Sequence, residues 1–149
     1  MLVTQRPLKN YRETVAEIFR LAREHMRDVR QYRDWNVFDY YNLIRSLPYV
    51  PDPIGVETVS RPGYTIKTDW TGPRDCDDKT VLILAWANLT GIPGRVVVCG
   101  QTERPHHVYP ELNLEFTSNW YPMDATYPDR SALGNTLYDE KFRKVFYER

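Results

Sequence analysis

An apolar segment at residues 81–89 (VLILAWANL) constrains the fold of this 149-residue chain more than any other stretch. Asp75 precedes it at a typical N-cap position, and Asp78 follows three residues later, as in a capping box. A glycine and a proline come soon after the segment and are typical helix stop signals. We therefore predict a buried central helix over residues 76–89. The side chains expected in the core are Val81, Leu82, Leu84, Ala85 and Leu89.

Two further helices are expected before this segment. Residues 8–31 contain no interior glycine or proline, and residues 34–47 end just before a proline, where helices usually stop. Both stretches carry apolar side chains at mostly helical spacing, which predicts amphipathic helices. Residues 48–74 hold five prolines and three glycines. They should form a loop, with a short extended piece at residues 56–59.

Three segments after the central helix have the composition of strands. Residues 95–99, 106–116 and 120–126 are rich in β-branched or aromatic side chains and are separated by turn formers. We expect them to form an antiparallel sheet. The tail, residues 127–149, begins as a loop and then allows either a short helix or a strand. The prediction is an α+β fold, with N-terminal helices and the central helix packed on the sheet, in a single domain over residues 1–149.

The charge balance excludes several classes of function. Lys plus Arg and Asp plus Glu each number 20, so no net field attracts nucleic acid or an anionic membrane.

The N-terminal sequence has no apolar run long enough for a signal peptide or membrane span, which predicts a cytoplasmic protein. The two cysteines form neither a CxxC pair nor a zinc spacing, and a reduced compartment makes a disulfide unexpected.

Cys76 stands in the first turn of the predicted central helix. Unpaired backbone N–H groups and the helix dipole favour a thiolate at such a position. The neighbouring carboxylates Asp75, Asp77 and Asp78 oppose it, so a cationic imidazole beside the sulfur would be needed to offset them. The alternative is a structural helix with an inert cysteine. Cys99 ends an apolar strand, and we predict that it is a buried thiol that resists alkylation.

Strand parity separates the two neighbouring histidines, because alternate residues of a strand point to opposite faces. His106 is predicted to point toward the core and His107 to lie on the polar face. If residues 115–118 form the loop to the next strand, Tyr109 lies opposite Asp124 and His107 becomes the diagonal neighbour of Asp124, within side-chain reach. The alternatives are an ordinary surface histidine and an aspartate that caps a turn.

Taken together, three blocks of this chain resemble the motifs of the transglutaminase-like superfamily. GPRDCDDKTVLILAWANLTGIPGRVVV resembles the nucleophile motif, in which a cysteine opens the central helix and a G-I-P-x-R-V turn leads into the first strand. HVYPEL and WYPMDATYP resemble the motifs of the family's histidine and aspartate. The blocks occur in the family's order and cover residues 72–128. The DCDDK form, preceded by YVPDPIGVE, is most similar to small transglutaminase-like proteins encoded by bacteriophages and prophages.

This resemblance implies a papain-like fold and a thiol acyl-transfer enzyme that acts on Gln or peptide amides without a cofactor. It assigns Cys76 as the nucleophile, His107 as general base and acid, and Asp124 as the group that orients His107. The chain departs from the family pattern where Pro110 interrupts the histidine strand. It also offers no certain side-chain oxyanion donor. Trp70 or a tyrosine could supply one beside the backbone N–H of Cys76.

Two other functions fit the same residues. The first is a phage virion structural or assembly protein that keeps the fold while its main work lies elsewhere, with phage structural proteins as partners and the virion as its location. The second is metal-assisted hydrolysis, although no H-x-x-x-H or similar ligand spacing occurs. The ligands available to a metal would be Asp75, Asp77, Asp78, His106, His107 and Asp124. For the enzyme, the expected partner is a protein or peptide substrate, and neither nucleic acid nor a membrane is expected.

Overall fold

The computed structural model of the protein describes residues 10–149. Its first helical region is broken where the sequence predicts one helix. The start of that predicted helix, at Leu8, lies outside the described residues, and the rest divides into α1 (Tyr11–Glu24) and the 3₁₀ helix η1 (Met26–Tyr32). His25 separates them with φ of −118° and ψ of 24°.

Contacts with a distant loop stabilise the 3₁₀ helix η1. The Asp28 carboxylate accepts hydrogen bonds from the Arg61 guanidinium, at 2.7 and 3.0 Å, and from the Gly63 N–H at 2.9 Å. At its end, the Tyr32 carbonyl accepts a hydrogen bond from the Trp86 indole at 2.8 Å. The break is therefore a tertiary effect, since the local sequence has no helix-breaking residue.

The second predicted helix and the loop after it form with small differences. Helix α2 (Val37–Ser46) begins after Asn36, whose side chain accepts the Asp39 N–H at 2.9 Å. Most of residues 48–74 is loop, as predicted, but a short helix α3 (Pro62–Thr65) forms within it. Residues 56–59 belong to no strand of the described chain.

The predicted central helix is present as α4 (Cys76–Thr90), and its cap is the one the sequence indicates. The Asp75 side chain accepts the N–H groups of Asp77 and Asp78, and Asp78 accepts the N–H of Asp75 in return. The helix ends at Gly91, which has the positive φ of a left-handed C-cap. Of the five side chains predicted in the core, four are buried, and Leu89, near the C-terminal end, is partly buried against the core.

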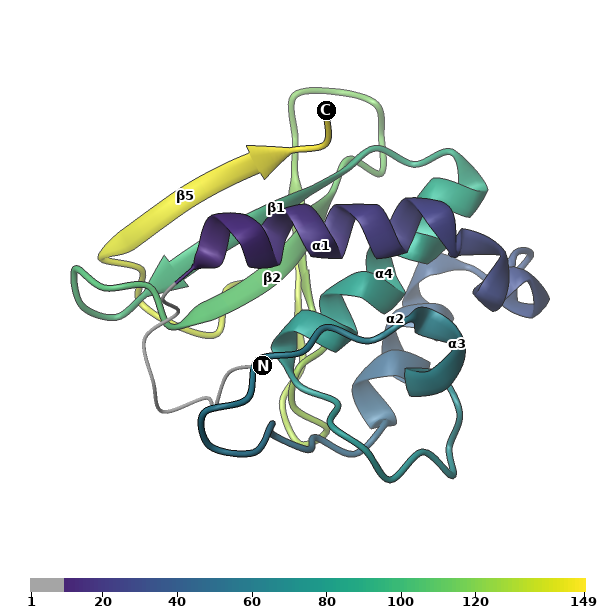
Figure 1. The fold of residues 1–149 in the computed structure, drawn as a ribbon. Coiled ribbons are helices and arrows are strands. Elements are labelled where there is room, and N and C mark those ends of the chain that lie inside the picture. Colours follow the sequence, from purple (N-terminus) through teal and green to yellow (C-terminus); the bar gives the residue numbers. More distant parts are fainter. Residues whose placement is uncertain (1–9) are drawn as a thin grey trace.

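The strands form one antiparallel sheet in the order β4-β3-β2-β1-β5, which confirms the α+β class. The three predicted strands are there, and the tail, for which the sequence allows either a helix or a strand, supplies the other two. Helices α1 and α4 lie over the same face of the sheet (Figure 1), with α1 packed on α4 and α4 packed on β1 and β2. The strands are β1 (Gly94–Gly100), β2 (His107–Leu112), β3 (Tyr121–Asp124), β4 (Ala132–Leu133) and β5 (Phe142–Tyr147).

The register between β2 and β3 agrees with the prediction. Leu112 pairs with Tyr121 and Glu111 with Pro122, and this register continues to place Tyr109 opposite Asp124. Both strands are shorter than predicted, since β2 ends at Leu112 and β3 at Asp124. The loop that follows is closed by the side chain of Asn113, which bonds both the N–H and the carbonyl of Thr117, and it contains Phe116 at φ 55°.

Both faces of β2 are buried, which corrects the predicted division into a core face and a polar face. All six residues of the strand are shielded from solvent, because the C-terminal segment covers the side away from α4. The prediction that His106 points into the core is wrong. His106 lies just before β2, is half-buried, and accepts the Gln101 N–H through Nε2 at 2.9 Å. That contact turns it toward the hairpin loop between β1 and β2.

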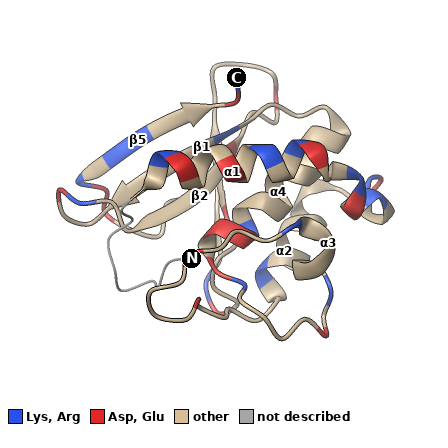
Figure 2. Cartoon of the chain, in the orientation of Figure 1, with Lys and Arg blue, Asp and Glu red and all other residues tan. Residues whose placement is uncertain are grey.

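Within residues 10–149, no helix has the length and apolar character needed to cross a bilayer. Acidic and basic residues are interspersed along the chain in the view of Figure 2, which also shows the acidic start of α4.

Candidate active site

The side chains of His107 and Asp124 meet between neighbouring strands. Nε2 of His107 lies 2.6 Å from Oδ2 of Asp124, and the two residues are 3% and 2% exposed. They come from β2 and from the end of β3, and the register explains the contact, since diagonal neighbours of an antiparallel pair are within reach of a long side chain. Of the three residues that the sequence singles out, these two are in direct hydrogen-bond contact.

Further donors fix the position of Asp124. Its Oδ1 accepts both the backbone N–H of Thr126, at 3.1 Å, and the Thr126 hydroxyl, at 2.5 Å. Its backbone carbonyl accepts the Tyr41 hydroxyl at 2.7 Å, and that same hydroxyl accepts the N–H of Ala132 at 2.9 Å. Helix α2 and strand β4 therefore both hold the end of β3, and the carboxylate presents Oδ2 to the imidazole.

Cys76 begins α4 close to this pair and is 7% exposed. Its thiol donates a weak hydrogen bond to Oδ1 of Asp77 at 3.8 Å. Burial raises the pKa of the Cys76 thiol well above its usual value, and the neighbouring Asp77 and Asp75 add to this. The backbone N–H of Val108, the residue after His107, acts in the opposite direction and lowers the pKa. The resting form is therefore the neutral thiol.

Burial also disfavours the ionised form of the acids next to Cys76. Burial raises the pKa of Asp75 well above its usual range, and the charges of Asp77 and Asp78 add to this effect. The pKa of Asp77 is raised for the same reason, and its Oδ2 is a buried oxygen without a hydrogen-bond partner among the described residues. The repulsion by these acids that the sequence predicts against a thiolate therefore acts together with burial, and burial is the larger obstacle to ionising Cys76.

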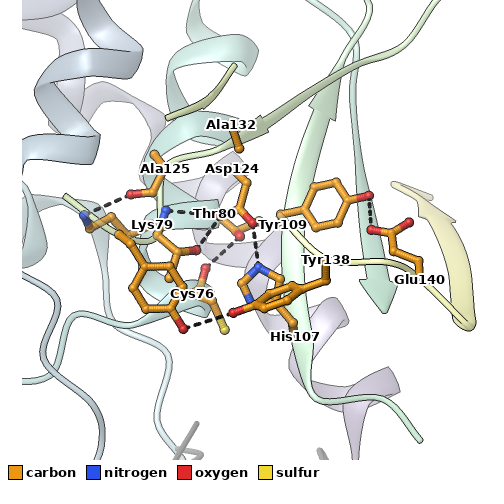
Figure 3. A network of polar contacts seen from close by, with 12 residues as sticks. Cys76, Lys79, Thr80, His107, Tyr109, Asp124, Ala125, Ala132, Tyr138 and Glu140 are labelled. Atoms are coloured by element: carbon orange, nitrogen blue, oxygen red, sulfur yellow. Dashed lines mark hydrogen bonds and ion pairs between the residues drawn. The ribbon is translucent and has the colours of Figure 1, made fainter. Parts of the chain in front are cut away.

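The arrangement leaves one ring nitrogen for chemistry. Because Nε2 of His107 bonds Asp124, Nδ1 is the nitrogen that can accept a proton from a thiol. Figure 3 shows the Cys76 sulfur near the His107 ring, with Asp124 on the other side of the ring in this view. A buried carboxylate that fixes an imidazole beside a thiol is the arrangement that nucleophilic catalysis by cysteine requires.

Three tyrosines, Tyr49, Tyr127 and Tyr138, enclose this group. The ring of Tyr138 stands edge-on to His107 with centroids 5.0 Å apart, and its hydroxyl donates to that of Tyr127 at 3.3 Å. Tyr127 in turn packs against Tyr49, with centroids 5.0 Å apart. Tyr49 and Tyr127 lie in the blocks YVPDPIGVE and WYPMDATYP, but the three residues come from separate loops, and no pattern in the sequence indicates that they meet.

Two buried cations hold the loop before the site, and no pattern in the sequence points to them either. Lys79 donates through Nζ to the carbonyls of Arg45, Leu47 and Ala125, at 3.2, 2.7 and 3.0 Å. Burial lowers the pKa of Lys79 to about 7. Arg74 is completely buried and its guanidinium donates to three further carbonyls, those of Pro48, Thr65 and Lys67.

Among residues 10–149, no three His, Cys, Asp or Glu side chains converge in a way that could hold a metal ion. The acids named as ligands for metal-assisted hydrolysis are used otherwise: Asp75 and Asp78 cap α4, and Asp124 holds His107. Trp70 is one candidate from the sequence for the oxyanion donor. Its indole N–H already donates to the Pro73 carbonyl at 2.9 Å.

Comparison with family models, with curated proteins and with solved structures found no match for this chain.

Proposed function

We propose that this protein is a cysteine-dependent acyl-transfer enzyme with a transglutaminase-like, papain-type core, acting on Gln or peptide amides. The observation that carries the proposal is the buried His107–Asp124 hydrogen bond of 2.6 Å beside a cysteine that opens a helix. The helix, the sheet and the order of the three residues along the chain agree with the resemblance in motifs. We also propose that all 149 residues belong to one domain and that the enzyme works in the cytoplasm of a bacterial host.

The reaction uses each side chain in turn. Nδ1 of His107 takes the proton of the Cys76 thiol while the sulfur attacks the carbonyl carbon of the amide. The C–S bond forms, and the electron pair of the C=O double bond moves to oxygen. When this tetrahedral intermediate collapses, the C–N bond breaks and the leaving amine takes the proton from His107. A thioester on Cys76 and free ammonia or amine are the products of this half-reaction.

The second half-reaction reverses these roles. Water or a primary amine attacks the thioester carbonyl, and His107 removes its proton. The C–S bond then breaks and Cys76 recovers a proton from the imidazolium. Asp124 keeps the Nε2–H tautomer in place throughout and stabilises the imidazolium when it forms. Hydrolysis and crosslinking therefore require the same three residues.

The closed tyrosine wall favours a second proposal, in which the protein is a phage virion or assembly protein whose triad is not its main function. Cys76 is only 7% exposed, and its neutral thiol rests against Asp77. An enzyme of this design must move Tyr127 or Tyr138 aside to admit an amide. A structural protein would have no need to do so, and its Cys76 would be no more reactive than Cys99.

The experiment that tests the enzyme is product analysis with a Gln-containing peptide, with and without a primary amine. Mass spectrometry should show conversion of Gln to Glu by hydrolysis, or a peptide–amine adduct when the amine is present. The Cys76→Ala variant should form neither product, whereas Cys99→Ala is the matched control and should keep the activity. Peptide that stays unchanged with wild-type protein would contradict the proposal and favour the structural role.

A further inference from the structure

Tyr49 has a hydroxyl group that is buried and makes no hydrogen bond with any residue of the described chain. Such groups are rare, because a buried polar atom without a partner loses its contacts with water and gains none in return. An unpaired donor that the fold keeps at one place is therefore a candidate for binding something that is present only during the function of the protein. Its position decides what that could be.

The backbone fixes Tyr49 next to the beginning of α4. Val50 and Arg74 exchange two backbone hydrogen bonds, of 2.9 and 2.7 Å, so the residue after Tyr49 is paired with the residue two positions before Cys76. On the other side, the Pro48 carbonyl accepts the Arg74 guanidinium at 3.3 Å. The residues on both sides of Tyr49 are therefore bonded to Arg74, which lies two positions before Cys76.

The ring of Tyr49 is held as well. It packs against Tyr127 with centroids 5.0 Å apart, and Tyr127 is linked through Tyr138 to the ring of His107. The pKa of Tyr49 is raised far above its usual value, first by burial and then by the nearby Cys76. The hydroxyl consequently keeps its proton and remains available as a hydrogen-bond donor.

We infer that Tyr49 is the side-chain oxyanion donor of the proposed acyl-transfer reaction, together with the backbone N–H of Cys76 in the first turn of α4. This inference depends on the proposed function. When sulfur attacks the carbonyl carbon, the carbonyl oxygen gains a negative charge, and the Tyr49 hydroxyl donates a hydrogen bond to it. Donors that are already in place when this charge develops stabilise the transition state without reorganisation. Trp70, whose N–H is bonded to Pro73, does not have this role.

The test compares two reactions of the same sulfur, and only one of them forms an oxyanion. With iodoacetamide, the thiolate displaces iodide from a CH₂ group, and no tetrahedral intermediate forms. With p-nitrophenyl acetate, the thiolate adds to the ester carbonyl, an oxyanion forms, and collapse breaks the C–O bond to release p-nitrophenolate and leave an acetyl thioester. Acylation needs an oxyanion donor, and alkylation does not.

The Tyr49→Phe variant should therefore lose acylation selectively. We expect the rate of p-nitrophenolate release to fall about 100-fold, the typical loss for one oxyanion donor, while the rate of alkylation at Cys76 changes less than twofold. Tyr147→Phe is the matched control, because Tyr147 is 58% exposed on β5, and it should change neither rate. Cys99→Ala in all variants removes the second thiol from both readouts.

The possible results separate this inference from the function on which it depends. If wild-type protein is acylated and Tyr49→Phe is acylated equally fast, the proposed enzyme stands and the role of Tyr49 is refuted. If Tyr49→Phe slows acylation and alkylation equally, Tyr49 acts on the thiol and the inference is also wrong. If wild-type Cys76 is alkylated but never acylated, the proposed function and the inference fail together. A large fall in Tm for Tyr49→Phe would show that the hydroxyl has a structural partner, which contradicts the premise.

Discussion

Oδ2 of Asp124 lies 2.6 Å from Nε2 of His107, and both side chains are almost completely shielded from solvent. This contact decides which nitrogen of the ring is available, because an imidazole whose Nε2–H is held by a carboxylate has its lone pair on Nδ1. Cys76 begins the helix beside them, and its thiol donates to Asp77 in this structure. In the proposed reaction, Nδ1 of His107 is the atom that takes the thiol proton.

The reactivity of Cys76 should depend on His107. In wild-type protein near neutral pH, iodoacetamide should alkylate Cys76 at least about tenfold faster than Cys99. Burial raises the pKa of both thiols, but Cys76 is 7% exposed whereas Cys99 is fully buried. His107→Ala should remove this advantage because no base remains to take the thiol proton. The matched control is His106→Ala, since His106 bonds the Gln101 N–H and should not influence the sulfur. Equal alkylation rates for both thiols in wild-type protein would argue for the structural role.

Replacing Asp124 by asparagine should reduce catalysis without unfolding the protein. The asparagine side chain would keep the size and an oxygen for Thr126, but its amide can hold the imidazole in the wrong tautomer and cannot stabilise an imidazolium. We expect the rate of thioester formation to fall by about 10³ to 10⁴-fold. Stopped-flow acylation and a thermal melt of Asp124→Asn measure the two effects. A variant that keeps full acylation activity would show that Asp124 does not orient His107.

Lys79 should be essential for stability although it is a charged residue inside the core. The change Lys79→Met leaves the carbonyls of Arg45, Leu47 and Ala125 without their donor, and a buried unpaired polar group is costly. We expect a loss of about 3 kcal/mol in the free energy of unfolding, measured with urea. Lys144→Met, on the exposed part of β5, is the matched control and should change stability by less than about 0.5 kcal/mol. Equal stability losses in the two variants would show that the buried ammonium group has no special role.

Asp78 should make the protein less stable as the pH rises through the acidic range. Burial raises the pKa of this acid from 3.8 to about 6 in the folded protein, so between these values the folded state binds the proton more readily than the unfolded chain. Stability contributed by this group is therefore present below about pH 4 and is lost as the pH rises to about 6. A shift of this size corresponds to about 3 kcal/mol.

The change Asp78→Asn removes this titration. Its single side-chain oxygen can accept from only one of the two N–H groups that bond the carboxylate, that of Ser60 at Oδ1 or that of Asp75 at Oδ2, and this loss is the same at every pH. Urea unfolding of wild type and variant at about pH 4, 5, 6 and 7 measures the difference. The free-energy gap between the two proteins should change by about 3 kcal/mol over this range, in favour of the variant at the higher pH. Parallel curves would show that Asp78 titrates as an ordinary surface acid.

Local patterns explain why α2, α4, the strands β1 to β3 and the register of β2 and β3 could be predicted from the sequence. The cap of α4 depends on Asp75 and Asp78 alone, and an apolar run that follows such a cap has few alternatives to a buried helix. The register of β2 and β3 follows from side-chain parity and the separation of the two strands, and it brings His107 to Asp124. These features are local, or depend on one pair of neighbouring strands.

Features that depend on contacts between distant segments could not be predicted. The break at His25 results from hydrogen bonds between Asp28 and the loop at residues 61–63. Arg74 can be buried because its guanidinium donates to the carbonyls of Pro48, Thr65 and Lys67. Parity alone predicts a core position for His106, but the strand begins one residue later and both of its faces are covered. A single sequence carries no local signal for any of these contacts.

The most direct test of the proposed enzyme is the mass of the intact protein after brief reaction with a Gln peptide and acid quenching. The proposed mechanism predicts an adduct equal to the peptide mass minus ammonia, located at Cys76 by peptide mapping and released by hydroxylamine as a thioester should be. The adduct should be present in Cys99→Ala, absent in Cys76→Ala, and strongly reduced in His107→Ala. Unmodified wild-type protein, or an adduct located on Cys99 instead of Cys76, would contradict it.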